Sequence, residues 1–281
     1  MKILVTNDDG IYAPGIIALA NRAAELGHDV TVVAPDRARS GAGHAITSSA
    51  ILVHRQTVCS HGAFQGYDPR VTAFSCDGTP ADCAIVGLVK IMRGQTDLLL
   101  SGINSGPNLG CDVFYSGTVA AAREGYFEGV RSIALSLNGE DHYESAVQAA
   151  EAIIAPENID AILGLGAGDS RPQTVPHRAA ALLNVNVPNL PPSEIKGFRA
   201  ASCGRRRYRE RLAETTAPDG RAVYWLHGPT ADDEERPDSD VIAVNEGFIA
   251  MTFLTHDTTD YARTAVLARH QLTLRRNGGL S

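Results

Sequence analysis

The sequence predicts an α/β protein with a Rossmann-like, three-layer α/β/α arrangement around a mostly parallel sheet, and observations near its start carry this prediction. Residues 3–5 form a short, unbroken apolar run, which is typical of a strand buried on both faces of a parallel sheet. Apolar side chains recur at helical spacing over residues 14–26, and a second apolar strand is expected over residues 29–33. Strand, helix and strand in this order predict a right-handed β-α-β unit.

The length and composition predict one large folded domain over residues 1–281, with a catalytic core in residues 1–200 and an arm, late strands and terminal helix in residues 201–281. The 44% of hydrophobic residues is enough for a substantial core. A formal net charge of −7 argues against a broadly basic surface, so no nucleic-acid polymer is expected as a partner. No apolar run approaches the ~20 residues of a membrane span, and no leader precedes the first strand, so we expect a cytoplasmic protein with no membrane partner.

The five cysteines predict neither a disulfide framework nor a zinc ribbon. Their number is odd, and no two of them form a C-x-x-C pair. We expect reduced thiols that pack as small buried residues. They are Cys59, Cys76, Cys83, Cys111 and Cys203.

Two adjacent carboxylates follow the first strand. Asn7, Asp8, Asp9 and Gly10 come directly after the apolar run. Ligands of open α/β sheets bind outside the carboxyl ends of the strands, so this cluster lies where function is expected. Adjacent aspartates repel each other unless a cation or a donor network compensates, which favours a metal. The same four residues are also typical of a turn, so on their own they leave turn and metal site equally open.

A glycine-rich polar loop follows the second strand at the same edge of the predicted sheet. Ser40 offers a hydroxyl group, while Gly41 and Gly43 allow backbone N–H groups to approach an anion. The loop lacks the Gly-Lys-Ser/Thr ending of a Walker loop, and it does not form G-x-G-x-x-G between a strand and a helix. His44 is a candidate acid–base group. A flexible connection is the alternative interpretation of the whole loop.

The next segment supplies structure without adding a catalytic residue. Strands are expected over residues 50–53 and 71–74, and a helix over residues 84–92. Thr79 is placed to cap this helix. Asp82 lies in its first turn, where it complements the helix dipole, and this role is enough to explain it.

A third polar loop follows a strand expected over residues 97–100. Asn104 and Asn108 bring side-chain oxygens that can ligate a hard cation or contact phosphate, although asparagines also favour such loops for their backbone geometry. An alanine-rich helix follows, capped by Ser116 or Thr118. Its amino terminus can bind an anion through free N–H groups, but capping alone also explains these residues.

The last part of the chain predicts an exposed arm. Residues 213–240 contain three prolines and an acidic run, which is typical of an arm or hairpin with few core residues. Strands are expected over residues 241–244 and 248–253, followed by a terminal helix over residues 261–274 with an apolar side. Residues 205–207 are three arginines, interpreted as a solvated charged face.

Taken together, these segments resemble the SurE family, the survival-protein 5′/3′-nucleotidases. The resemblance is dense up to about residue 138 and sparser from there to residue 254. It departs from the family mainly near the end, where residues 251–254 replace the usual Thr-Pro-Leu. The segments that carry it are residues 2–15, 34–37, 40–47, 78–83, 101–110, 115–125, 183–188 and 238–240.

The resemblance implies one divalent cation per subunit, held by Asp8, Asp9, Ser40 and Asn104, with Asp8 and Asp9 as the catalytic pair. Four oxygen donors without His or Cys suit Mg²⁺ or Mn²⁺ better than zinc. The residues expected around the phosphate are Asn7, Gly41, Gly43, Asn108, Ser116, Gly117 and Thr118.

The predicted function is therefore metal-dependent hydrolysis of nucleoside 5′-monophosphates, with 3′-monophosphates as further substrates, by a homodimer or homotetramer that exchanges its terminal elements. The alternative is a sugar-nucleotide-dependent glycosyltransferase or a non-catalytic nucleotide-binding module. A glycosyltransferase of this type needs a second Rossmann half after about residue 150, for which only residues 163–168 offer a glycine-rich loop. A phosphoaspartyl enzyme would place its two aspartates as Asp-x-Asp, whereas Asp8 and Asp9 are adjacent.

Overall fold

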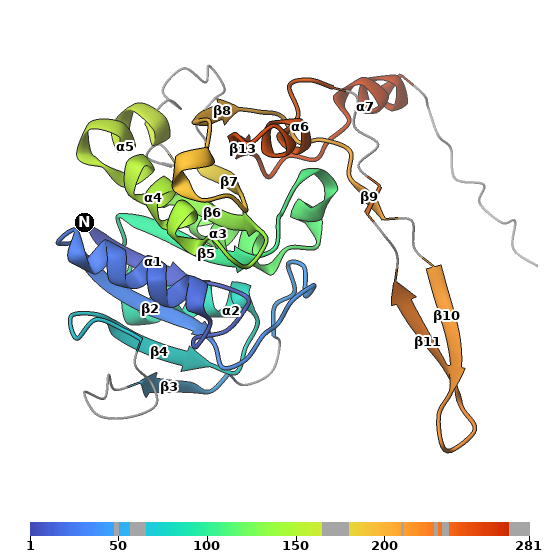
Figure 1. The fold of residues 1–281 in the computed structure, drawn as a ribbon, viewed down its shortest axis with the longest axis horizontal. Coiled ribbons are helices and arrows are strands. Elements are labelled where there is room, and N and C mark those ends of the chain that lie inside the picture. The colour runs from blue at the N-terminus through green and yellow to red at the C-terminus, as the bar shows by residue number, and fades with distance from the viewer. Residues whose placement is uncertain are drawn as a thin grey trace, which may run out of the picture.

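A nine-stranded sheet runs through the centre of the protein (Figure 1), with the strand order β3-β4-β2-β1-β5-β6-β7-β13-β8. The computed structural model describes residues 1–47, 51–56, 66–164, 180–208, 211–227, 230–231 and 236–269. Neighbouring strands are parallel except for the pairs β3–β4 and β7–β13. The sheet strands are β1 (Lys2–Thr6), β2 (Asp29–Pro35), β3 (Val53–Gln56), β4 (Thr72–Cys76), β5 (Leu98–Ser105), β6 (Arg131–Asn138), β7 (Leu182–Pro188), β8 (Phe198–Ala200) and β13 (Ile249–Leu254).

Helices cover both faces of this sheet. One face carries α1 (Pro14–Glu25), α4 (Tyr143–Ile154) and α5 (Pro156–Leu163), and the other carries α2 (Pro80–Ile85), its π-helical continuation η1 (Val86–Ile91) and α3 (Gly117–Phe127). Strand β1 shows how the sequence builds both layers: Ile3 and Val5 join the core under α1, while Leu4 joins the core under α2 and α3. Burying one such side chain contributes roughly 2 kcal/mol. The predicted three-layer α/β/α class is confirmed.

The strand order places a crevice between β1 and β5. From β1 the chain adds β2 and β4 on one side, whereas β5, β6 and β7 extend the sheet on the other. Two parallel strands whose connections leave in opposite directions open a gap at their carboxyl ends, and this is where α/β proteins bind ligands. Asp8 follows β1, and Asn104 lies near the end of β5. The topology therefore brings two of the predicted polar loops to one edge.

Several predicted elements are shifted, and one is wrong. The strand expected over residues 50–53 overlaps β3 only at Val53, and residue 50 lies outside the described residues. The helix expected after the Thr79 cap begins at Pro80, directly after that cap, as predicted. The strand predicted over residues 241–244 is instead the helix α6 (Asp240–Asn245), capped by Ser239, whose Oγ accepts from the Ile242 N–H at 3.2 Å. A short apolar run does not distinguish strand from helix, and here the cap decides.

The predicted glycosyltransferase arrangement has no counterpart in the described part of the chain. After residue 180, strands β7, β8 and β13 join the first sheet and build no second one of Rossmann type. The glycine-rich stretch weighed for a donor loop lies, apart from its first two residues, in the undescribed range 165–179. The predicted division into a core of residues 1–200 and a later part of residues 201–281 stays a prediction. Strand β13, from the later part, belongs to the central sheet.

The predicted arm is a β-hairpin that extends away from the sheet (Figure 1). It consists of β10 (Arg211–Thr216) and β11 (Ala222–His227), and its root is the short pair β9 (Arg207–Tyr208) and β12 (Thr230–Ala231). Tyr224 and Trp225 are 60% and 62% exposed. The terminal helix α7 (Tyr261–Ala268) has no buried residue, and its predicted extension to residue 274 lies outside the described residues. No helix within the described ranges is long and apolar enough to span a bilayer.

Candidate functional site

The turn after β1 presents two carboxylates at the carboxyl edge of the sheet. The Asn7 Nδ2 donates to the Gly10 carbonyl at 2.9 Å, and the Asn7 Oδ1 accepts from the Gly10 N–H at 3.2 Å. Both ends of this amide therefore shape the turn. The predicted contact of Asn7 with phosphate stays a prediction, because its side chain is already engaged within the turn.

Asp8 is a buried carboxylate held against the start of helix α3. Only 4% of the residue is exposed, and the Thr118 hydroxyl donates to its Oδ1. A Cβ atom at Gly117 would lie 2.8 Å from the Asp8 Cβ, so the helix can approach this closely only with glycine there. Burial raises the pKa of Asp8 to about 6; the Thr118 bond lowers it and the neighbouring Asp9 charge raises it. Such a desolvated carboxylate needs a positive partner to be fully ionised.

Asp9 spans the crevice between β1 and β5. Its Oδ2 accepts from the Ser105 N–H at 3.0 Å. Burial raises the pKa of Asp9, the Ser105 bond opposes this, and the charge of Glu140 raises it further. The Tyr143 hydroxyl bonds to the Ser105 side chain, and burial raises the pKa of Tyr143 as well. Sequence reasoning missed Ser105, Glu140 and Tyr143, although strand-end position was a usable signal for Ser105 and Glu140.

The Ser40 loop is tied to both sides of the crevice. The Arg39 N–H donates to the Asp8 carbonyl at 2.7 Å, and the Gly43 N–H donates to the Tyr115 carbonyl at 3.0 Å. Ser40 itself is exposed, one residue past the bond to Asp8. Because the Gly43 N–H is used inside the protein, it is not free to bind phosphate in this arrangement. Gly41 has a left-handed backbone with φ +72°.

His44 anchors the far end of the same loop. Its Nε2 pairs with the Glu124 carboxylate on α3, and its ring stacks on Phe127 with centroids 6.0 Å apart. The interpretation of this loop as a purely flexible connection does not describe these contacts. His44 thus anchors the loop to α3. Its observed contacts are with Glu124 and Phe127 and not with the two aspartates, so they do not support the suggested acid–base role.

Asn104 lies inside β5, which continues past the predicted end of this strand to Ser105. The register of β5 against β6 shifts between Gly102 and Asn104, so the strand carries an irregularity next to the site. The Asn104 Nδ2 donates to the Gly106 carbonyl at 2.8 Å. This bond uses the amide nitrogen, and Oδ1 is the atom that would ligate a cation.

Asn108 belongs to a buried polar network rather than to an open loop. Its Nδ2 donates to the Ser136 Oγ at 2.7 Å, and its N–H donates to the Asn186 Oδ1 at 2.7 Å. Its carbonyl accepts from Asn184 and Asn186 at 2.9 and 3.1 Å. These contacts fix the loop to β6 and β7, so a direct contact of Asn108 with phosphate stays a prediction. Sequence reasoning gave no role to Asn184 and Asn186, although two asparagines alternating with apolar residues in a buried strand signal such a network.

The start of α3 resolves the open choice of its cap. The Ser116 Oγ accepts from the Val119 N–H at 3.0 Å, so Ser116 is the N-cap, while Thr118 turns its hydroxyl to Asp8. The N–H groups of the first turn have no partner within the helix, and the helix dipole favours an anion there. The amino terminus of α3 therefore lies directly beside the buried carboxylate.

The oxygen donors fit a hard divalent cation. Asp8 and Asp9 would supply adjacent carboxylates from the turn after β1, Asn104 a neutral oxygen from β5, and Ser40 a neutral oxygen from the loop after β2. No histidine or thiol is in contact with either aspartate among the described residues, so the donor set suits Mg²⁺ or Mn²⁺ and not zinc. The desolvated Asp8 carboxylate is the group that gains most from such a charge.

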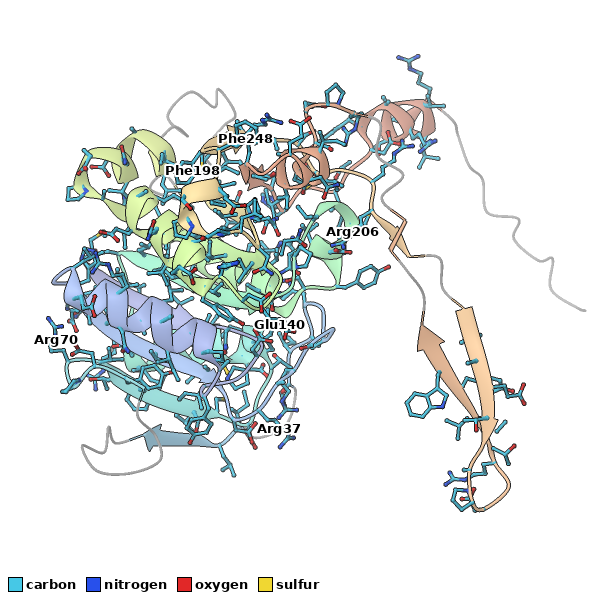
Figure 2. All side chains as sticks on the ribbon, in the orientation of Figure 1. Arg37, Arg70, Glu140, Phe198, Arg206 and Phe248 are labelled. Atoms are coloured by element: carbon cyan, nitrogen blue, oxygen red, sulfur yellow. The ribbon has the colours of Figure 1, made fainter. Side chains whose placement is uncertain are left out.

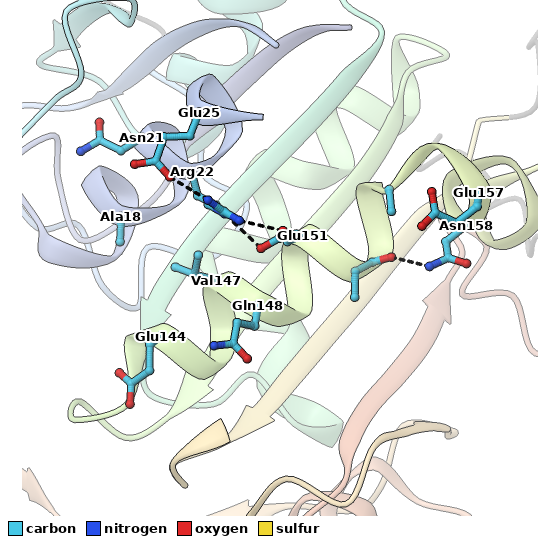
Figure 3. A pocket seen from close by; sticks show the side chains of 12 residues that line it. Ala18, Asn21, Arg22, Glu25, Glu144, Val147, Gln148, Glu151, Glu157 and Asn158 are labelled. Atoms are coloured by element: carbon cyan, nitrogen blue, oxygen red, sulfur yellow. Dashed lines mark hydrogen bonds and ion pairs between the residues drawn. The ribbon is translucent and has the colours of Figure 1, made fainter. Parts of the chain in front are cut away.

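A large groove elsewhere on the molecule contains none of the predicted site residues. It measures about 970 Å³ and lies between α1 and the pair α4 and α5 (Figure 3). Arg22 occupies its wall, donating to Glu151 at 2.8 and 3.0 Å and to Glu25 at 2.9 Å. The groove is formed by helix surfaces, whereas the polar loops gather at the strand ends.

Comparison with known proteins decides the family. A family model described as Survival protein SurE matches residues 3–210. The chain belongs to the SurE family. The 5′-nucleotidase SurE of Gloeobacter violaceus is 44% identical over 268 residues, which cover 92% of this chain and 91% of that protein. The 5′/3′-nucleotidase SurE of Proteus mirabilis is 40% identical over 267 residues, or 95% and 94% of the two chains.

A solved SurE structure shares the fold. The crystal structure of the SurE protein from Aquifex aeolicus has a TM-score of 0.73 and 35% sequence identity, and the match covers 95% of this chain and 98% of that one. The resemblance stated from the sequence is therefore confirmed. The residues matched by the SurE family model include every predicted metal and phosphate residue and end at the root of the arm.

Proposed function

We propose that this SurE-family protein is a 5′-nucleotidase, a hydrolase that converts nucleoside monophosphates to nucleoside and phosphate. The names of its relatives in Gloeobacter violaceus and Proteus mirabilis support this activity, the second also for 3′-monophosphates. The observation that carries the proposal is the placement of Asp8 and Asp9 at the β1–β5 crevice, each fixed by a bond from a different element. Adjacent, oriented carboxylates beside a helix amino terminus suit phosphoryl transfer.

The proposed cofactor is one divalent cation per subunit, Mg²⁺ or Mn²⁺, held by Asp8, Asp9, Ser40 and Asn104. When bound, this cation supplies Lewis-acid charge for the phosphate. The chain itself has a net charge of −7, so a phosphate dianion would otherwise be repelled from two carboxylates. Thr118 and Ser105 then keep the two carboxylates in place.

Phosphate recognition is proposed at the start of α3 and at Gly41. The Gly117 N–H lies in the first turn of the helix, and Ser116 caps this turn without using it. Thr118 directs both its N–H and its hydroxyl to Asp8, so the N–H groups of Gly117 and Gly41 are the proposed donors. These donors would orient the equatorial oxygens as negative charge redistributes during transfer. The predicted residues Asn7, Gly43 and Asn108 support the surrounding loops through their own bonds.

The test is hydrolysis of a panel of nucleoside 5′- and 3′-monophosphates with and without metal. We expect exhaustive EDTA treatment to abolish phosphate release, and added Mg²⁺ or Mn²⁺ to restore it. Vanadate should inhibit, and in crystals it should lie at the start of α3. Full activity after chelation would refute the metal centre, and a metal-loaded protein inactive on every nucleotide would refute the proposed substrate class.

Assembly into a homodimer or homotetramer in the cytoplasm is a separate proposal. It is supported by the exposed α7 and by the exposed aromatic residues of the hairpin, which the described residues of the chain leave uncovered. Light scattering of the full chain and of a truncation before Thr255 tests the role of the terminal helix. An oligomer that becomes a monomer on truncation supports exchange of α7, and a full chain that is already a monomer at micromolar concentration refutes it.

A further inference from the structure

The root of the arm is locked to the loop that leads into α3. Arg206 immediately precedes β9, and its guanidinium donates to the Asp112 carboxylate at 2.9 Å. Figure 2 labels Arg206 beside the short 3₁₀ helix η2 (Gly110–Phe114), which contains Asp112. Only 12% of the Arg206 side chain and 7% of the Asp112 side chain are exposed. The prediction of a solvated charged face at residues 205–207 is therefore wrong for Arg206.

A second set of contacts clamps the same loop. The buried Asp240 accepts from the Gly110 N–H at 2.9 Å and from the Gly204 N–H at 2.8 Å, so it bridges η2 and the segment between β8 and β9. A Cβ atom at Gly110 would lie 2.6 Å from the Gly204 carbonyl oxygen. The backbone at Gly110 also has φ +54°, which glycine adopts readily. Two segments almost a hundred residues apart thus pack in direct backbone contact.

The clamped loop continues without interruption into the candidate phosphate site. The Asp112 carbonyl accepts from the Tyr115 N–H at 2.9 Å and from the Ser116 N–H at 3.0 Å. Ser116 caps α3, and Thr118 in the first turn donates to Asp8. A displacement of Asp112 would therefore move the cap, the first-turn N–H groups and the donor to the buried carboxylate together.

We propose that Arg206 is a positioning residue for hydrolysis, acting through Asp112 on the amino-terminal turn of α3. This inference rests on the proposed function, because it assigns Arg206 a role at that same site without contact to substrate. Removing Arg206 takes a buried charge partner away from Asp112, so the loss of Arg206 should displace Asp112 from its place in η2. The root of the arm, where Arg206 lies, is then part of the support of the site, and the β10–β11 hairpin beyond the root is not.

The test compares Arg206→Met, Arg206→Lys and Asp112→Asn with Arg131→Met. Arg131 is the matched control, because it makes a 2.7 Å ion pair with Asp160 at the opposite, amino-terminal end of the sheet. We expect Arg206→Met to lower kcat/KM about tenfold, since small misplacements of reacting groups are costly. Arg206→Lys should recover part of the loss, and the double variant with Asp112→Asn should lose less than the two single losses combined.

A readout independent of turnover separates positioning from general stability. Amide hydrogen exchange in residues 110–118 should become faster in Arg206→Met and stay unchanged in Arg131→Met, with far-UV circular dichroism unchanged in both. An Arg206→Met protein with wild-type kcat/KM and unchanged exchange would overturn the inference. The inference would also be overturned if the loss of activity in every variant equalled its unfolded fraction. Asp112→Asn provides the same test if Arg206→Met does not fold. An inactive wild type would instead overturn the proposed nucleotidase.

Discussion

The turn after β1 and the β10–β11 hairpin differ in how far the rest of the protein encloses them. The turn is enclosed: Asn7 closes it on Gly10, and Asp8 is 4% exposed under the start of α3. Among the described residues, the hairpin strands pair only with each other, and Tyr224 and Trp225 are mostly exposed. An isolated two-stranded hairpin is only marginally stable in water. Burial thus adjusts the chemistry of the turn, whereas the hairpin depends on contacts beyond its own strands.

Replacing the buried Asp8 carboxylate is expected to have the largest effect, which is on turnover. In Asp8→Asn the shape is kept and the charge is lost, so we expect turnover to fall by about a thousandfold, as for loss of a principal transition-state group. The fold should survive, because a neutral amide is less costly to bury. Phosphate release and thermal unfolding measure the two quantities. Asp97→Asn at the opposite edge, where Asp97 accepts from the Lys2 N–H, is the control and should keep its activity. If Asp8→Asn unfolds and the wild type binds no metal, Asp8 and Asp9 have only a structural role in the turn.

The pH dependence of stability gives the next largest effect. The pKa of Asp8 rises from 3.8 to about 6 on folding, so between these values the folded state holds a proton that the unfolded state has lost. Stability therefore falls as pH rises through this window, and the free energy of unfolding loses about 3 kcal/mol from Asp8. Urea unfolding in EDTA from pH 4 to 7 measures it as the difference between wild type and Asp8→Asn. A difference that stays constant with pH would show that Asp8 is not desolvated.

Removing the Thr118 hydroxyl should lower activity without abolishing it. Thr118→Val keeps the shape of the side chain but takes the donor from Asp8, and a bond to a charged group is worth about 2 kcal/mol, so kcat/KM should fall about thirtyfold. The pKa of Asp8 should also rise, because the hydroxyl stabilises the ionised form. Thr118→Ser, which keeps the donor, is the matched control. Equal losses in both variants would assign the effect to packing alone.

The smallest effect on turnover is expected in the arm. Replacing Tyr224 and Trp225 with serine should change kcat by less than about twofold, because the site residues come from other elements, whereas the mass in light scattering should fall if the arm joins subunits. Val89→Ser removes a similarly exposed apolar side chain, at 57%, from η1, which is not part of the arm, and should leave the mass unchanged. A large loss of kcat with unchanged mass would contradict the separation of arm and site.

Much of the fold was predictable because local patterns and tertiary structure agree there. The buried run at Ile3, Leu4 and Val5, and the helix opened by Pro14, are formed as expected. The segment at Val241 misled because four apolar residues fit either a strand or a helix, and only the Ser239 cap and the packing on β13 favour the helix. Continuation of β5 through Asn104 was also not predictable, since pairing with β6 overrides the turn preference of the sequence.

The candidate site was predictable at its strand ends and not in its long-range contacts. Asp8 and Asp9 can be recognised in the sequence because they are adjacent and directly follow a buried strand. No local pattern links Thr118 to Asp8, which lie 110 positions apart, or Arg206 to Asp112. An arginine within a basic run looks the same in sequence whether it is solvated or buried in an ion pair. Such pairings arise from the packing of whole elements, and only coordinates reveal them.

The contacts of Asp240 also set an order of events during synthesis. All proposed metal and phosphate residues have been synthesised once residue 118 is added, but Asp240, which bonds to both Gly110 and Gly204, follows about 120 residues later. At about 5–20 residues per second this interval lasts roughly ten seconds. A nascent chain therefore carries the complete set of ligand side chains while the loop leading to α3 still lacks its clamp. The clamp on a site formed by residues of the first half of the chain is therefore supplied by Asp240, in its second half.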